Sequence, residues 1–544
     1  MPSTLEHNNL FLHDFPYHSQ RMPVVASHGV VATSEPLAAQ AGLWMLRRGG
    51  SAVDAALATA IALTVLEPTS NGIGSDAFAL VWEGDKLHGL NASGRAPAGH
   101  TLERFAAEGH TSMPERGWRS VTVPGAPAAW KDLHDRFGKL PFATLFEPAI
   151  DYARHGFPVG PVTAEAWGVL ARSYRGPFQG PEFAPWWDLF APGGETPQPG
   201  AIFQSPGHAW TLERIAASGS EDFYRGEIAS RIAVFAKDSG GLLSVEDLRN
   251  HTNTWVEPVK TNYRGHDVWE IPPNGQGIAA LSALNILEGF ELDRDPRESI
   301  ASYHLQIEAM KLAFADALRY VADPARAPVP VAGLLDKGYA AERRALIGDR
   351  AGDPAPGTPP GGGTVYLCAA DADGMMVSMI QSNYQGFGSG IVIPGTGISI
   401  QNRGHGFVLD PRHPNALAPG KRPYHTIIPA FLSKDGVPIG PFGVMGGYMQ
   451  PQGHVQMVVN QVDYGMNPQA ALDAPRWQWL RGRQVVLELS VPDHIVRGLA
   501  SRGHTVEVRP HPASFGKGQI IRRLGNGVYV AGSEPRCDGC AVGF

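Results

Sequence analysis

The chain has 544 residues, of which 43% are hydrophobic and 18% are charged, so it is long and apolar enough for a large folded core. Its formal net charge is −7 and it contains no long basic run, which excludes the usual electrostatic pattern of a nucleic-acid-binding protein. We therefore expect no nucleic-acid partner.

The N-terminal residues, MPSTLEHNNLFLHDFPYH, lack the cationic start and the apolar core of a signal peptide. The longest apolar stretch, residues 55–66, is too short to cross a bilayer and lies between Asp54 and Glu67. Three cysteines are too few for a disulfide framework in a chain of this length. These features predict a cytoplasmic protein without a membrane partner.

The first part of the chain is predicted to be mainly helical. A helix over residues 35–48 has Ser34 as its N-cap, and a second, which ends at Leu66, starts with a capping box of Ser51 and Asp54. This second helix is apolar on nearly every side and should be buried. A glycine-containing loop, 71–75, then leads into a strand, 77–82. Further helical patterns cover residues 126–137, 142–155, 208–217, 225–238, 278–288 and 299–321.

The second part of the chain is richer in strand patterns, and it begins after a Pro- and Gly-rich stretch at 353–363. Strands are predicted at 365–370, 375–381 and 427–432, and helices at 451–464 and 467–474. A helix-rich first part and a strand-rich second part predict an α+β fold in which strands from both parts share sheets.

The junction between the two parts places Thr364 directly after Gly361-Gly362-Gly363. If the chain is cut before Thr364, its hydroxyl becomes a nucleophile beside its own α-amine. That amine has an ordinary pKa of about 7.7–8, which suits a general base at neutral pH. Taken alone, Gly-Gly-Gly-Thr favours a simpler interpretation, a flexible linker before a strand.

Other familiar sites are absent or weak. The sequence has no H-E-x-x-H, Walker loop or G-x-S-x-G motif. The glycines of Gly72-Ile-Gly74 follow a helix rather than a strand, which argues against a dinucleotide site. Cys537 and Cys540 form a single C-x-x-C without a second ligand pair, so we interpret them as ordinary thiols. No metal site is predicted.

Two downstream features could complete a site around Thr364. Ser382 lies on the second strand of a predicted hairpin, where its hydroxyl could bond the threonine Oγ; it could equally be a half-buried strand serine. Gly446 and Gly447 precede a helix and could present two backbone N–H groups to one oxygen, as an oxyanion hole requires. The alternative for the two glycines is a tight strand-to-helix turn.

Short strings spread over nearly the whole chain favour the catalytic interpretation of Thr364, Ser382, Gly446 and Gly447 over the simpler one. The strings are A-V-D-A-A at 52–56, E-P at 67–68, V-P-G at 123–125, G-G-L at 240–242, P-P-N-G-Q-G at 272–277, K-R-P at 421–423, D-Y-G at 463–465 and A-P-R at 474–476. With them, the sequence resembles the γ-glutamyltransferase (γ-glutamyltranspeptidase) family of N-terminal-nucleophile hydrolases.

The resemblance implies an αββα sandwich that is made as an inactive precursor. Self-cleavage between Gly363 and Thr364 would give a large subunit, 1–363, and a small subunit, 364–544, which stay together as a heterodimer. Whether this heterodimer pairs further is left open.

The resemblance also implies roles in catalysis. Thr364 would attack an amide carbonyl to form an acyl-enzyme, Gly446 and Gly447 would stabilise the oxyanion, and Ser382 would stand where the family has a second threonine. Water or an amine then releases the acyl group, and neither a metal nor an organic cofactor is needed.

The positions that bind a glutamyl group in the family differ in this chain. They are occupied by Tyr384, Arg403, Gly406, His425 and Thr426, in place of an asparagine, a glutamine, an aspartate and two serines. The family's carboxylate-binding arginine has no aligned equivalent, and Arg95, two residues away, is the candidate replacement. The aspartate lost at Gly406 matters most, because a buried ammonium without a carboxylate partner is costly. By contrast, Arg403 and His425 favour an anionic group.

Three functions remain open at this point. The first is a self-processing γ-glutamyltransferase-like amidohydrolase, of a signal-less bacterial branch, which cleaves γ-glutamyl amides such as glutathione by hydrolysis or transfer to an amine. The second is an acylase for a small carboxylate-bearing amide of the oxamate or glutaryl type. The third is a catalytically silent relative that binds a metabolite, against which the intact Thr364, Gly446 and Gly447 argue.

Overall fold

Two seven-stranded sheets form the centre of the computed structural model, which describes residues 21–354 and 363–544. All neighbouring strands in both sheets are antiparallel. The first sheet has the order β19 (Cys540–Gly543), β2 (Gly29–Thr33), β10 (Gly363–Asp371), β11 (Met376–Tyr384), β3 (Asp76–Glu83), β4 (Lys86–Ala92), β7 (Thr254–Val256). The second has the order β1 (Val24–Ala26), β18 (Tyr529–Gly532), β17 (Lys517–Arg523), β13 (Val437–Met445), β12 (Ala430–Lys434), β9 (His266–Glu270), β8 (Val259–Tyr263).

The two sheets pack face to face. Trp82 of β3 stacks on Phe431 of β12, with ring centroids 5.5 Å apart. Gly443 of β13 lies against the ring of Tyr366 on β10, so closely that a Cβ at this glycine would be 2.5 Å from the ring. Both sheets contain strands from before and after Thr364, as the sequence predicts, because β2 and β9 each pair with strands of the later part.

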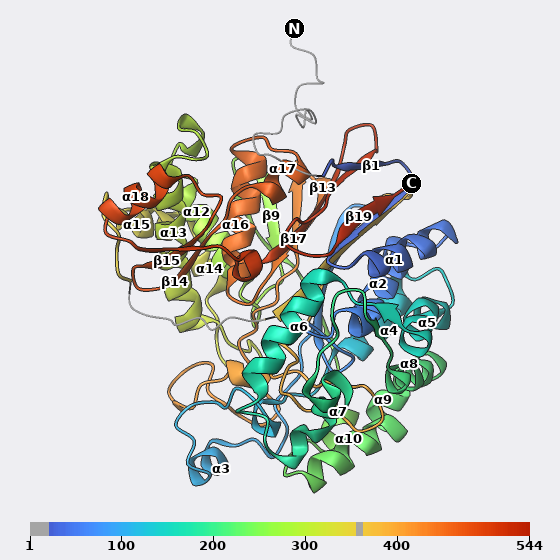
Figure 1. The fold of residues 1–544 in the computed structure, drawn as a ribbon. Coiled ribbons are helices and arrows are strands. Elements are labelled where there is room, and N and C mark those ends of the chain that lie inside the picture. Colours follow the sequence, from blue (N-terminus) through green and yellow to red (C-terminus); the bar gives the residue numbers. More distant parts are fainter. Residues whose placement is uncertain (1–20, 355–362) are drawn as a thin grey trace.

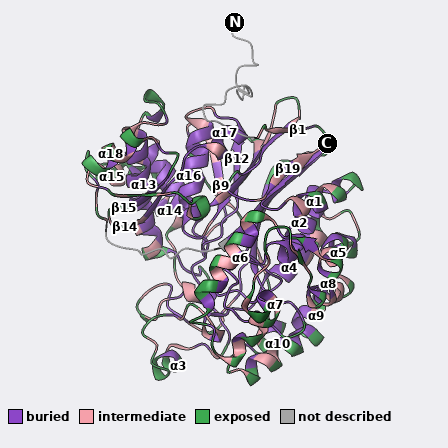
Figure 2. Ribbon diagram, in the orientation of Figure 1, coloured by how far each residue is buried: buried purple, intermediate pink, exposed green. Residues whose placement is uncertain are grey.

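Helices cover the outer face of each sheet, which gives the expected αββα order (Figure 1). On the first sheet lie α1 (Pro36–Arg47), α2 (Ala52–Leu66) and α4 (Ala126–Phe137), with α5 (Glu147–His155) and α8 (Pro206–Ser218) outside them. On the second lie α12 (Gly277–Leu287) and α16 (Met449–Val462), with α13 (Ile300–Tyr320) packed against α12. Figure 2 shows the central strands of the sandwich as mostly buried.

The remaining elements surround this sandwich. The other helices are α3 (Leu102–Ala107), α6 (Pro161–Tyr174), α7 (Ala184–Phe190), α9 (Glu221–Arg225), α10 (Glu227–Asp238), α11 (Val245–Arg249), α14 (Val331–Leu334), α15 (Lys337–Arg344), α17 (Pro468–Asp473) and α18 (Asp493–Ser501). The other strands are β5 (Phe157–Pro158), β6 (Ile202–Phe203), β14 (Trp477–Arg481), β15 (Gln484–Glu488) and β16 (Thr505–Arg509).

The helix starts show where local sequence rules hold and where they fail. The capping box of α2 is confirmed: Ser51 Oγ accepts from Asp54 N at 3.1 Å, and Asp54 Oδ2 accepts from Ser51 N at 2.9 Å. The predicted N-cap of α1 was wrong. Glu35 caps this helix by accepting from Ala38 N, while Ser34 donates to Glu67. Ser34 thus bonds a residue that is distant in the sequence, and its neighbour Glu35 acts as the cap instead.

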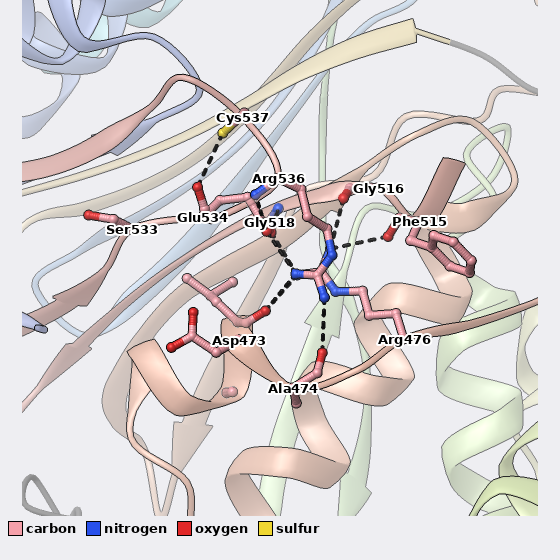
Figure 3. Close-up of polar contacts among 12 residues, drawn as sticks. Asp473, Ala474, Arg476, Phe515, Gly516, Gly518, Ser533, Glu534, Arg536 and Cys537 are labelled. Carbon is pink, nitrogen blue, oxygen red and sulfur yellow. Dashed lines mark hydrogen bonds and ion pairs between the residues drawn. The ribbon is translucent and has the colours of Figure 1, made fainter. Parts of the chain in front are cut away.

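A buried ion-pair cluster holds the C-terminal segment onto the sandwich (Figure 3). The carboxylate of Glu534 accepts from Arg476 at 2.6 Å and from Arg536 at 2.8 Å, and Arg536 also pairs with Glu488 at 2.6 Å. Because every charge has a close partner, this cluster satisfies the condition for burying ions. Cys537 lies beside it as a free thiol, as predicted.

No helix in the described ranges is long and apolar enough to cross a membrane. The predictions for the N-terminal residues and for the glycine-rich linker fall on 1–20 and 355–362, outside the described residues.

Candidate active site

Thr364 is the second residue of β10 and is buried, with 1% of its surface exposed. The β10–β11 pairing passes from Gly363–Tyr384 to Val365–Gln381, so the ladder is irregular at Thr364. Such irregularities re-aim a side chain. Thr364 Oγ1 lies 3.0 Å from Ser382 Oγ on β11, the hydroxyl contact that the sequence predicts.

Ser382 is held by two further groups. Its Oγ accepts from the backbone N–H of Tyr384 at 2.8 Å and from Nη2 of Arg403 at 3.2 Å. The first bond depends on the backbone of Tyr384, whose φ of 77° is rare for a residue with a side chain. Local strain of this kind is concentrated at functional sites.

Arg403 is a fully buried guanidinium at the start of a 3₁₀ turn, Arg403–Gly406. Its Nη1 donates to Thr426 Oγ1 at 2.6 Å, and its Cζ lies 4.3 Å from the centre of the Tyr384 ring. Burial lowers the pKa of Arg403 to about 10, against the opposing effect of Asp76, so it stays protonated at neutral pH.

The acid near Arg403 is Asp76, the first residue of β3, whose Oδ2 is 4.0 Å from Arg403 Nε. The same oxygen accepts from His425 Nε2 at 2.9 Å, and Oδ1 accepts from Gly94 N at 3.2 Å. His425 Nδ1 accepts from the N–H of Ile427, so Nε2 carries the ring proton. Burial and then Arg403 hold the pKa of His425 well below its usual range, so its ring is neutral.

The backbone at Gly446 and Gly447 links β13 to α16. Their φ angles are 128° and 60°, and the first lies in a region open almost only to glycine. Their carbonyl oxygens accept from Met449 N at 3.0 Å and Gln450 N at 3.2 Å. The first backbone N–H groups of a helix have no partner within the helix. At α16 the carbonyl oxygens of the two glycines accept from these groups.

Gln276 connects these glycines to the threonine cluster. Its Nε2 donates to the carbonyl oxygens of Thr426, at 2.6 Å, and Gly447, at 2.9 Å. Hydrogen bonds thus connect Gly447 through Gln276 to the carbonyl of Thr426, and the hydroxyl of Thr426 through Arg403 to Ser382 and Thr364.

The structure brings most of the predicted site residues together but leaves Arg95 apart. Arg95 Nη1 donates to Thr252 O at 3.1 Å, and its side chain borders a separate cavity of about 300 Å³ with Val123, His251 and Gly420. Gly406 also contributes no side chain to the cluster; a Cβ there would lie 2.7 Å from Tyr424 O.

Sequence reasoning missed three residues of the cluster. Asp76 ends the glycine loop that was considered only as a nucleotide motif, Gln276 lies in the P-P-N-G-Q-G string, and Tyr448 follows Gly447. Tyr448 hydrogen-bonds the Tyr384 side chain, and burial raises the pKa of Tyr384 to about 12. The sequence shows the strings in which these residues lie, but no neighbouring residue indicates what their side chains contact.

One group in the described part of the chain has metal-ligand spacing: His304, Glu308 and His504, whose ligand atoms lie within 4.8 Å of one another. Lys311 Nζ already pairs with Glu308 at 2.7 Å, and His304 bonds His504 at 2.9 Å. The buried ammonium stands where a cation would be needed, so we assign no metal to this group.

The αββα sandwich, with strands of both parts of the chain in each sheet, is the fold of the N-terminal-nucleophile hydrolases. Comparison with a model of the gamma-glutamyltranspeptidase family matches residues 38–544. The chain belongs to this family, and it is an enzyme of the family's hydrolase and acylase group.

Several relatives match over nearly the full length. The glutathione hydrolase-like YwrD proenzyme of Bacillus subtilis is 37% identical over 96% of this chain and 99% of its own. The oxamate amidohydrolase proenzyme of Klebsiella pneumoniae is 35% identical over 96% of this chain and 99% of its own. The crystal structure of cephalosporin acylase from Bacillus halodurans has 55% identity and a TM-score of 0.94, and covers 98% of each chain.

Proposed function

We propose that this protein is a self-processing amidohydrolase that cleaves γ-glutamyl-type amides and does not depend on the substrate's α-amine. The precursor cleaves itself between Gly363 and Thr364, and the fragments 1–363 and 364–544 form the mature heterodimer. The cleaved acyl group is a short dicarboxylic acyl chain, such as glutaryl or γ-glutamyl. Hydrolysis or transfer to an amine completes the reaction.

The mature site would work as follows. The Thr364 hydroxyl adds to the amide carbonyl carbon while its proton passes to the α-amine of the same residue. The N–H groups at Gly446 and Gly447 stabilise the oxyanion. Collapse of the tetrahedral intermediate expels the amine, which takes the proton and leaves an ester on Thr364. Water, or an acceptor amine, then attacks the ester carbonyl and frees the acid or the new amide.

The observation that carries the substrate proposal is the full burial of Asp76 among protein partners. In the described residues it is the carboxylate of the Thr364 cluster, and its two oxygens accept from His425 and Gly94 beside Arg403. The side chains of Asp76 and Arg403 are both fully buried, so an ammonium group of the substrate could reach Asp76 only by being buried itself next to the Arg403 guanidinium, which is costly. A glutamyl α-amine should therefore add little to binding.

The relatives support amide hydrolysis with a variable acyl group. Their names include a glutathione hydrolase-like protein, an oxamate amidohydrolase and a cephalosporin acylase. This range is consistent with a shared nucleophile and a divergent acyl pocket.

The decisive experiment compares kcat/KM for glutaryl and γ-glutamyl p-nitroanilides on the purified, processed protein, with Thr364→Ala as the inactive control. We expect the glutaryl compound to react as well as the γ-glutamyl compound or better. A γ-glutamyl preference of about 100-fold, or about 2.7 kcal/mol, would mean that an ammonium site exists and would overturn the substrate proposal. Oxamate and glutathione in the same series test the substrates that the names of two relatives suggest.

A further inference from the structure

We propose that the cavity beside Arg95 is a second binding site, which takes a free α-amino acid with an aliphatic side chain. Arg95 binds the carboxylate of this ligand, and Asp247 binds its ammonium group. The inference goes beyond the proposed function, because none of the described residues that line the cavity belongs to the Thr364 cluster.

The cavity has the size and the fixed walls of a small-molecule site. Its volume of about 300 Å³ is at the lower end of the range for ligand pockets. The lining residues lie at 95–98, 123, 247–251 and 419–420. Two of these segments are joined by backbone hydrogen bonds: Ala96 N donates to Lys421 O at 2.8 Å, and Gly420 N donates to Ala96 O at 3.0 Å. Parts of both proposed fragments therefore form the walls.

One end of the cavity is positively charged. Arg95 is half-buried, and its Nη1 donates to Thr252 O at 3.1 Å. The buried Arg422 donates to the same oxygen at 3.3 Å, and its other side-chain bonds go to a carbonyl and a hydroxyl oxygen. Burial first and then Arg95 lower the pKa of Arg422 to about 10, against the opposing effects of Asp323 and Asp76. A carboxylate beside Arg95 would offset the repulsion between the two guanidinium groups and accept a charge-assisted hydrogen bond.

The other charged group is Asp247, the half-buried third residue of α11. Its Oδ2 accepts from the N–H and the hydroxyl of Ser244, at 2.9 and 2.6 Å, and its Oδ1 accepts from Ala98 N at 2.8 Å. A carboxylate has about four lone-pair sites, so Oδ1 keeps one for an ammonium group. Because this carboxylate would repel a simple anion, the cavity suits a ligand that carries both charges.

The spacing of the two charges and the apolar walls select an α-amino acid. Asp247 is bonded to Ala98, three positions after Arg95, and three residues span at most about 11 Å. Both charged side chains thus belong to one short wall, which suits charges that are attached to a single carbon. Val123 and Pro419 add apolar surface for an aliphatic side chain. Burial lowers the pKa of His251 to about 3, so this ring is neutral and adds no second cation.

The test is calorimetric titration of the processed protein with L-leucine and two matched analogues. The first, 4-methylpentanoate, lacks only the amine, and the second, 3-methylbutylamine, lacks only the carboxylate. We expect leucine to bind and each analogue to bind at least about 10-fold more weakly, since each loses hydrogen bonds to a charged group. Equal binding of 4-methylpentanoate would mean a simple anion site and would overturn the proposal. Absence of leucine binding up to about 10 mM would also overturn it.

Variants place the ligand in the cavity. Arg95→Gln and Asp247→Asn should each weaken leucine binding by about 10-fold or more. Arg343→Gln is the matched control, because Arg343 is also half-buried and donates to a backbone carbonyl, Leu312 O at 3.0 Å, but does not line the cavity. Unchanged leucine affinity in the two cavity variants would reject this site. If a cavity variant does not fold, the analogue series decides by itself.

Activity measurements separate this site from the proposed function. Asp247→Asn should leave kcat/KM for the anilides within about 2-fold. An equal loss of leucine affinity and of kcat/KM would place leucine in the substrate path and reject a second site. Selective leucine binding by a protein that turns over neither anilide would reject the substrate proposal and support the amino-acid site.

Discussion

The backbone at Gly446 allows a direct test of the oxyanion hole through one substitution, Gly446→Ala. Its φ of 128° is strained for alanine, so the peptide must rotate. Space is tight but not prohibitive, because a Cβ would lie 3.2 Å from Gly516 Cα and 3.4 Å from Met449 Cβ. The substitution should therefore act mainly by turning the backbone N–H groups away from the substrate oxygen.

The expected magnitude separates a catalytic role from a structural one. The strain should lower stability by about 1–3 kcal/mol. Loss of one oxyanion donor should lower kcat a further 100- to 1000-fold, which corresponds to about 2.7–4 kcal/mol. Gly436, at the other end of β13, provides the matched control: its φ is 76° and no atom lies within 4 Å of its Cβ position. Gly436→Ala should lower stability by about 1 kcal/mol and leave kcat unchanged.

The assay is kcat of the processed enzyme on the faster anilide, with Tm and the extent of self-cleavage measured on the same samples. Self-cleavage must be checked, because the precursor uses the same nucleophile. A Gly446→Ala protein that matures, loses stability like Gly436→Ala and keeps full kcat would show that Gly446 and Gly447 are only a turn.

Three more predictions follow from the described contacts. Wild-type protein should yield a small fragment that begins T-V-Y-L, whereas Thr364→Ala should stay as one band on a denaturing gel; cleavage of that variant would exclude Thr364 as the self-processing nucleophile. Gly443→Ala should lower stability by about 1–3 kcal/mol, because its Cβ would lie 2.5 Å from the Tyr366 ring. An unchanged Tm would mean that the two sheets move apart at this point without cost. Burial lowers the pKa of His100 to about 3 from an ordinary 6.5. Between these two pH values the unfolded chain binds more protons than the folded protein. The free energy of unfolding should therefore fall as the pH drops below 6.5, by up to about 1.4 kcal/mol per pH unit. His100→Phe should raise Tm more at pH 5 than at pH 7, and an equal shift at both pH values would contradict this linkage.

The sequence by itself determined the features that depend on neighbouring residues. The capping box of α2 needs only Ser51 and Asp54, three positions apart, and the structure has it. The hairpin that faces Ser382 toward Thr364 follows from two predicted strands close together in the sequence, and this contact is present at 3.0 Å. The family and the αββα fold were also readable, because their short strings are spread along the whole chain.

Only the tertiary structure decided the surroundings of the nucleophile. Asp76 and His425 are 349 positions apart, and no local pattern reveals that β3 brings a carboxylate to a buried imidazole and guanidinium. The sequence showed an acid missing at Gly406 and a new cation at Arg403, and the natural inference was a cation open to substrate. The fold instead pairs Arg403 with protein groups from distant segments and directs Arg95 to Thr252. The physical reason is that burying a charge requires a partner, and the partner can come from anywhere in the chain that the sheets bring close.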